Sequence, residues 1–193
     1  LAGLDRRPPG TRLLVHAAAG GVGLLVGRWA RRLGATVIGT VSSEAKARLA
    51  REYGYEHVIV TAQPRFADAV QRLTGGQGAE VLIDGLGEGA RDENLAALAR
   101  RGHWISLGNA TGPLAQVDTH ALLAKSITFT RPVVFDFVAT RAELERRATR
   151  LWAALADGTL KQPPIERHAL ANVAEAHARL EGRATSGAVV LLA

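Results

Sequence analysis

Short apolar runs alternate with amphipathic helical patterns along the first two thirds of the chain. Runs such as "RLLVHA" (12–17), "ATVIGTV" (35–41) and "AEVLIDG" (79–85) are apolar over consecutive residues. Strands of this kind are buried on both faces, as in parallel sheets that helices cover on each side. The pattern therefore predicts an α/β fold, a doubly wound parallel sheet of the Rossmann type with about six strands.

Further elements follow the same rhythm. Strands are expected at 57–60, 103–109 and 126–130, and helices after residues 23, 43 and 65 and over 89–100. Ser42 or Ser43 is expected to cap the second helix, and Gly34 and Gly54 to end the first two helices.

The rhythm changes after residue 135. Thr140 and Glu143 have the spacing of a capping box ahead of a long helix, and an extended stretch, a short helix and a terminal strand follow. We therefore expect a Rossmann domain over 1–135 and a C-terminal α/β tail over 136–193.

Composition restricts the classes of function. The chain has no cysteine, its six histidines lack metal-ligand spacing, and no apolar run approaches the ~20 residues of a membrane span. The net charge is +6, but the arginines are dispersed over helix surfaces without interleaved aromatic residues. These features predict a cytoplasmic protein that binds no metal, nucleic acid or membrane.

The stretch "HAAAGGVG" (16–23) lies between the first strand and the first helix. Its frame is Ala18-x-Gly20-x-x-Gly23, with Ala18 in place of the first glycine of G-x-G-x-x-G. Missing side chains let a pyrophosphate approach the N–H groups at the helix N-terminus. The stretch predicts dinucleotide binding.

The end of the second strand bears on the choice of dinucleotide. It reads "GTVSSEAK", so hydroxyls at Ser42 and Ser43 and the ammonium group of Lys46 follow the strand. These groups favour a 2′-phosphate and hence NADP(H). Glu44 is the opposing feature, because a carboxylate accepts hydrogen bonds from a ribose hydroxyl, as in NAD sites.

Six motifs occur together in order: "HAAAGGVG", "GTVSSEAK", "VLIDGLGE", "SLGNATG", "FTRP" and "RATSG". In this combination the chain resembles the zeta-crystallin-like quinone oxidoreductase branch of the medium-chain dehydrogenase/reductase superfamily. The resemblance implies a Rossmann domain joined to a GroES-like catalytic domain, and zinc-independent hydride transfer from NADPH to a quinone or conjugated carbonyl.

The resemblance also assigns cofactor-binding residues to this chain. The pyrophosphate is assigned to the glycine turn, the 2′-phosphate to two residues after the second strand and to an arginine near the C-terminus, and the nicotinamide half to the ends of the later strands. These residues are Gly20, Gly21, Val22 and Gly23; Ser42, Lys46 and Arg183; and Gly85, Leu86, Gly108, Asn109, Thr130 and Arg131.

Two departures from the family are visible. Thr61 stands where relatives often have a tyrosine beside the 2′-phosphate, and only a few residues precede the first strand where relatives have most of the catalytic domain. The catalytic residues are therefore unknown, and we expect the chain alone to bind NADPH and to reduce quinones poorly. The strand near Ile127–Phe129 is expected at the sheet edge, and it predicts a homodimer.

Three alternatives remain open at this stage. The enoyl reductase domains of polyketide and fatty-acid synthases share the glycine turn, although "IDGLGE" and "LGNATG" favour the quinone branch. A zinc-dependent alcohol dehydrogenase is disfavoured by the lack of cysteine. A non-catalytic NADPH-binding module is the third.

Overall fold

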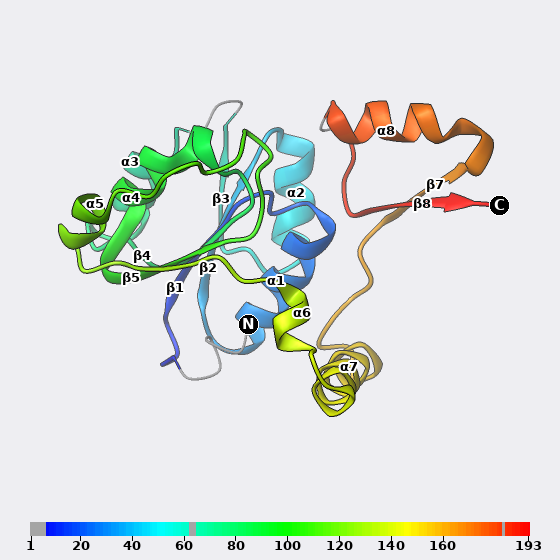
Figure 1. Cartoon of the computed structure of the whole chain (residues 1–193), viewed down its shortest axis with the longest axis horizontal. Helices are drawn as coiled ribbons and strands as arrows, with labels where there is room; N and C mark the ends of the chain where they lie inside the picture. The colour runs from blue at the N-terminus through cyan, green and yellow to red at the C-terminus, as the bar shows by residue number, and fades with distance from the viewer. Residues whose placement is uncertain (1–6, 62–64, 183) are drawn as a thin grey trace.

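The computed structural model describes residues 7–61, 65–182 and 184–193. Its main element is a parallel sheet of six strands in the order β3-β2-β1-β4-β5-β6 (Figure 1). The order confirms the predicted doubly wound Rossmann-type sheet and puts β6 at an edge. The strands are β1 (Arg12–Val15), β2 (Thr36–Val41), β3 (His57–Val60), β4 (Ala79–Asp84), β5 (Leu98–Ser106) and β6 (Thr128–Thr130).

Helices cover both faces of this sheet. α1 (Gly21–Arg32) and α2 (Glu44–Glu52) pack on one face, and α3 (Ala67–Leu73) and α4 (Arg91–Ala97) pack on the other. Successive strand residues face opposite sides, so Leu13 and Leu14 enter different cores, and both are fully buried. This double burial is why the strands are apolar over consecutive positions.

The region before β5 differs from the prediction. The helix expected over 89–100 is a 3₁₀ turn, η1 (Glu88–Ala90), followed by the seven-residue α4, and β5 begins at Leu98 rather than at residue 103. Leu98 is buried and pairs with Ala79, after which the β4–β5 register shifts. Lys125 donates to the carbonyls of Leu95, Ala96 and Leu98 at this end of α4.

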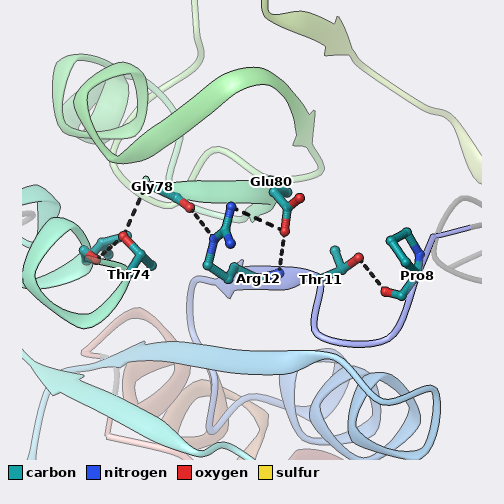
Figure 2. A network of polar contacts seen from close by, with 7 residues as sticks. Pro8, Thr11, Arg12, Thr74, Gly78 and Glu80 are labelled. Carbon is teal, nitrogen blue, oxygen red and sulfur yellow. Dashed lines mark hydrogen bonds and ion pairs between the residues drawn. The ribbon is translucent and has the colours of Figure 1, made fainter. Parts of the chain in front are cut away.

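A polar network joins the amino ends of β1 and β4 (Figure 2). The Arg12 backbone N–H donates to Glu80 Oε2 (2.9 Å), and its side-chain Nε donates to the Gly78 carbonyl (2.9 Å). The Thr74 hydroxyl donates to the Val70 carbonyl (2.8 Å) and accepts from the Gly78 N–H (2.9 Å). This network stabilises the edge of the sheet that lies opposite the carboxyl ends of the strands.

The later part of the chain carries the remaining elements: α5 (Thr119–Leu123), α6 (Val134–Phe137), α7 (Arg141–Ala156), β7 (Ile165–Ala169), η2 (Leu170–Asn172), α8 (Val173–Glu181) and β8 (Ala188–Leu192). The predicted capping box at the start of α7 is confirmed in both of its hydrogen bonds. β7 and β8 form a separate two-stranded parallel sheet.

This tail lies beside α1 and α2 (Figure 1). Arg28 of α1 donates to the carbonyls of Gly158 (3.1 Å) and Thr159 (3.2 Å). The Tyr53 hydroxyl, just after α2, donates to the Gln162 carbonyl (2.8 Å). The tail is therefore tied to the Rossmann sheet through the two helices that flank β1 and β2.

Candidate functional site

The strand order reverses at β1, whose neighbours are β2 and β4. The chain leaves β2 and β4 for helices on opposite faces, which opens a crevice at the carboxyl ends of the strands. The His16 N–H, directly after β1, donates to the Ile83 carbonyl of β4 (3.0 Å) and closes the bottom of this crevice.

The glycine turn leads from β1 to α1 at this crevice. Gly20 is the N-cap of α1 and supplies no capping side chain, and the first turn of the helix contains no acidic residue. The first N–H groups of an α-helix lack partners within the helix, and the helix dipole adds partial positive charge there. The turn is therefore suited to an anionic group, and Val22 lies exposed beside it.

The glycines of this turn meet different constraints. A Cβ on Gly23 would lie 2.4 Å from the Ala17 carbonyl oxygen, so Gly23 allows α1 to pack against the end of β1. A Cβ on Gly21 would lie 3.1 Å from the carbonyl oxygen of Gly187 in the tail, and one on Gly20 would lie 3.2 Å from Ala17 O. Close packing within the protein thus explains part of the glycine pattern before any ligand is considered.

The tail contacts the turn directly through Gly187. Its N–H donates to the Ala19 carbonyl (2.9 Å), and Gly187 forms an isolated parallel bridge with Gly20. Gly187 has φ +74°, and a Cβ on it would lie 2.2 Å from the Pro164 carbonyl oxygen. Only glycine fits this position, which fixes the tail against the turn.

A pocket of about 220 Å³ opens at the carboxyl ends of β1, β2 and β3. Four predicted site residues meet there: Gly20, Ser42, Lys46 and Leu86. The remaining lining residues are Ala17, Ala19, Thr40, Val41, Thr61, Phe66, Ala110, Thr111 and Thr185.

Ser42 and Lys46 lie on either side of the start of α2. Ser42 is exposed, while Ser43 caps the helix by accepting from the Lys46 N–H (3.3 Å), as predicted. Glu44 occupies the first turn with its side chain exposed and outside the pocket lining. Ser42 and Lys46, rather than Glu44, therefore border the pocket.

The loop after β4 is organised by the buried carboxylate of Asp84. Its Oδ1 accepts from the N–H groups of Leu86 (2.7 Å) and Gly87 (3.2 Å), and its Oδ2 accepts from Trp104 Nε1 (3.0 Å). At Gly85 an added Cβ would meet no heavy atom within 4 Å. Gly85 therefore faces open space at the crevice, which leaves room for a bound molecule.

A second cluster forms at the carboxyl ends of β5 and β6. Arg131 Nη1 donates to Ser106 Oγ (2.8 Å) and to the Gly108 carbonyl (3.5 Å), and Nη2 donates to Asn109 Oδ1 (3.1 Å). Gly108, Asn109 and Arg131 are thus brought together. They line no part of the 220 Å³ pocket, so the predicted residues form two groups along one edge of the sheet.

Thr130 differs from its predicted companions. Its hydroxyl oxygen lies 2.8 Å from His103 Nε2 of β5, and burial lowers the pKa of His103, with the charge of Arg7 acting in the same direction. Arg183 lies outside the described residues, while Thr185, two positions later, lines the pocket.

Sequence reasoning missed His16, Thr40 and Phe66. His16 is buried, with Nδ1 2.9 Å from Thr40 Oγ1 and Nε2 2.7 Å from Asn94 Oδ1, and burial lowers the pKa of its imidazole. The signal in the sequence was a histidine near the end of the apolar run 12–17. Helical spacing predicts that Phe66 faces inward, but its place in the pocket depends on how α3 packs and has no local signal.

Residues 21–152 match the model of a family described as zinc-binding dehydrogenases. The chain belongs to this family. The match begins at the first residue of α1 and includes the Arg131 cluster and most of the pocket lining, but not Ala17, Ala19 and Gly20 before α1 or Thr185 in the tail. Among the described residues of this family member, no group of three or more histidine, aspartate and glutamate side chains could hold a metal ion.

One relative of the chain is a quinone oxidoreductase of Pseudomonas aeruginosa. It is 40% identical, and the match covers 95% of the chain and 57% of the relative. A 2-haloacrylate reductase of a Burkholderia species is 38% identical over 95% of the chain and 56% of the relative. The crystal structure of Escherichia coli quinone oxidoreductase complexed with NADPH matches the chain with a TM-score of 0.91 and 35% identity. The match covers 97% of the chain and 59% of the Escherichia coli protein. The chain thus spans a little over half the length of these proteins. Among its described helices, none is long and apolar enough to cross a membrane.

Proposed function

We propose that the chain binds NADPH along the carboxyl edge of the sheet and forms the cofactor-binding part of an oxidoreductase. The observation that carries the proposal is the pocket that joins an uncapped helix N-terminus with Ser42 and Lys46. The space in front of Gly85 supports it, since a dinucleotide extended along this edge needs room at that residue.

Each end of the dinucleotide has its own residues in this proposal. Gly21, Val22 and Gly23 present backbone N–H groups to the pyrophosphate, while Gly20, whose own N–H donates to the Ala17 carbonyl (2.8 Å), borders it without a side chain. The 2′-phosphate accepts hydrogen bonds from Ser42 and Lys46, and such charge-assisted bonds are stronger than neutral ones. Arg183 is proposed as a third donor to the same phosphate.

The nicotinamide half is proposed to lie at the ends of β4, β5 and β6. Gly85 and Leu86 border it on one side, and Gly108, Asn109 and Thr130 border it on the other. Arg131 holds the Asn109 amide and the end of β5 in place through its three hydrogen bonds. These residues orient the cofactor ring and exclude water beside it.

The bound cofactor supplies a hydride, and we propose a quinone or conjugated carbonyl as its acceptor without participation of zinc. The names of the relatives, quinone oxidoreductase and 2-haloacrylate reductase, support this class of acceptor. We further propose the domain division 1–135 and 136–193, a cytoplasmic location, and a homodimer formed through the exposed edge of β6.

A fluorescence titration of the chain with NADPH and NADH tests the proposal. We expect saturable binding of NADPH and at least tenfold weaker binding of NADH, because the 2′-phosphate adds charged hydrogen bonds. Lys46→Met should remove most of this difference, while Arg100→Met, an exposed arginine at the opposite edge of the sheet, should leave it unchanged. Absence of NADPH binding would contradict the proposal.

A further inference from the structure

His16 connects three parts of the molecule beneath the pocket. It follows β1, its Nδ1 lies 2.9 Å from the Thr40 hydroxyl on β2, and its Nε2 lies 2.7 Å from Asn94 Oδ1 on α4. Its ring contacts the ring of Phe66 at a centroid distance of 4.6 Å. His16 does not line the pocket, whereas Thr40 and Phe66 both do.

The hydrogen bonds determine the protonation state of the imidazole. Asn94 Oδ1 can only accept, so Nε2 of His16 carries the proton. Nδ1 of the neutral ring then accepts from the Thr40 hydroxyl. Burial favours the neutral form, although the nearby carboxylate of Asp84 and the bond to Asn94 act in the opposite direction.

The same helix also holds Phe66. Glu93, next to Asn94 on α4, accepts from the N–H groups of Phe66 and Ala67 at 2.7 Å each. Two adjacent side chains of α4 therefore position two residues of the pocket lining. Glu93 holds Phe66 directly at the start of α3, and Asn94 acts on Thr40 through His16. The Thr40 carbonyl in turn accepts from the Ala18 N–H in the glycine turn (3.1 Å).

We infer that His16, as the neutral Nε2–H tautomer, is a positioning residue for the adenosine end of the pocket, acting through Thr40 and Phe66. The inference rests on the proposed NADPH site. It assigns His16 an effect on the end of the nucleotide next to Ser42 and Lys46, since Thr40 lies on the strand that leads to those residues. The side chain itself touches no part of the ligand.

Substitutions at His16 separate its two hydrogen bonds. His16→Phe keeps the ring volume and removes both bonds, and we expect about tenfold weaker binding of NADPH and of the half-ligand adenosine 2′,5′-bisphosphate. His16→Asn places an amide oxygen near the former Nδ1 and should restore most of the affinity. His16→Gln reaches only Asn94 and should restore less.

Matched valine substitutions control for loss of stability. Thr40→Val and Thr74→Val each remove a buried hydroxyl at constant shape, but Thr74 belongs to the network at the amino edge of the sheet (Figure 2). Thr40→Val should weaken both ligands about as much as His16→Phe. Thr74→Val should leave both dissociation constants within twofold of the wild type.

Nitrogen chemical shifts of the imidazole supply a spectroscopic readout, and they should show a neutral ring protonated at Nε2 at pH 7. A ring protonated at Nδ1, or a charged ring, would overturn the inference. So would equal losses of affinity in His16→Phe and Thr74→Val, or a loss for NADPH without one for the bisphosphate. If the wild-type chain binds no NADPH, the proposed function fails and the inference fails with it.

Discussion

Replacement of Gly187 by alanine tests whether the tail positions the glycine turn. Gly187 has φ +74°, its N–H donates to the Ala19 carbonyl, and a new Cβ would lie 2.2 Å from the Pro164 carbonyl oxygen. Gly158, also in the tail, has φ +75° but no heavy atom within 4 Å of a new Cβ. Comparison of Gly187→Ala with Gly158→Ala therefore separates the effect of a left-handed backbone from the effect of steric overlap.

The structure gives the expected size of each effect. A left-handed backbone costs a non-glycine residue about 1–2 kcal/mol. A Cβ at 2.2 Å is also more than 1 Å inside ordinary van der Waals contact, and overlaps of this kind typically cost about 1–3 kcal/mol. We expect Gly158→Ala to incur only the first cost. In Gly187→Ala the backbone at residue 187 should move away from Pro164 to relieve the overlap. Because the same residue is bonded to Ala19, this movement should also loosen its contact with the turn while the sheet stays folded.

Hydrogen exchange of individual amides and NADPH titration provide the measurement. In Gly187→Ala the amides of residues 187 and 188, which are bonded to Ala19 and Pro164, should exchange at least tenfold faster, and NADPH should bind several-fold more weakly. Gly158→Ala should match the wild type in both readouts. Unchanged exchange in Gly187→Ala, or equal effects in the two variants, would refute the role of the tail in shaping the site.

Three other predictions concern stability and binding. Gly85→Ala should leave the free energy of unfolding within about 0.5 kcal/mol of the wild type but weaken NADPH binding, because its Cβ enters open space at the crevice; fluorescence titration and urea unfolding measure the two effects. Burial lowers the pKa of His16 and of His103, so as the pH falls the unfolded chain binds these protons before the folded chain does. The free energy of unfolding should therefore be highest above about pH 6.5 and decrease at lower pH. The urea midpoints of the wild type and of His16→Gln should differ above that pH and converge below it. Lys125→Met should destabilise by about 1–3 kcal/mol in urea unfolding, since Nζ donates to three carbonyls at the end of α4, whereas the exposed Arg100→Met should have little effect.

Much of the sheet is predictable from sequence because burial on both faces leaves an uninterrupted apolar run. The strand around Leu13 and Leu14 is of this kind, and its location was confirmed. Local hydrogen bonds are equally predictable, as Ser43 at the start of α2 and the Thr140–Glu143 capping box illustrate. In each case the residues that determine the structure lie within a few positions of one another.

Features that depend on distant contacts could not be predicted. Leu98 belongs to β5 because it pairs with Ala79, and helical spacing alone favoured a longer helix there. The constraint on Gly21 comes from Gly187, almost at the other end of the chain. Leu73 has helical spacing with Val70 and was expected to face inward, but it is 41% exposed, whereas Val70 is fully buried.

The bridge between Gly20 and Gly187 joins segments separated by most of the chain. Closing so long a loop is entropically unfavourable, so during folding this contact should form late, after the local strand–helix units have assembled. An intermediate with a complete six-stranded sheet would then still lack the wall that contains Thr185. The chain would consequently bind a nucleotide only after this last folding step. The rate at which nucleotide binding appears during refolding would therefore measure the rate of that step.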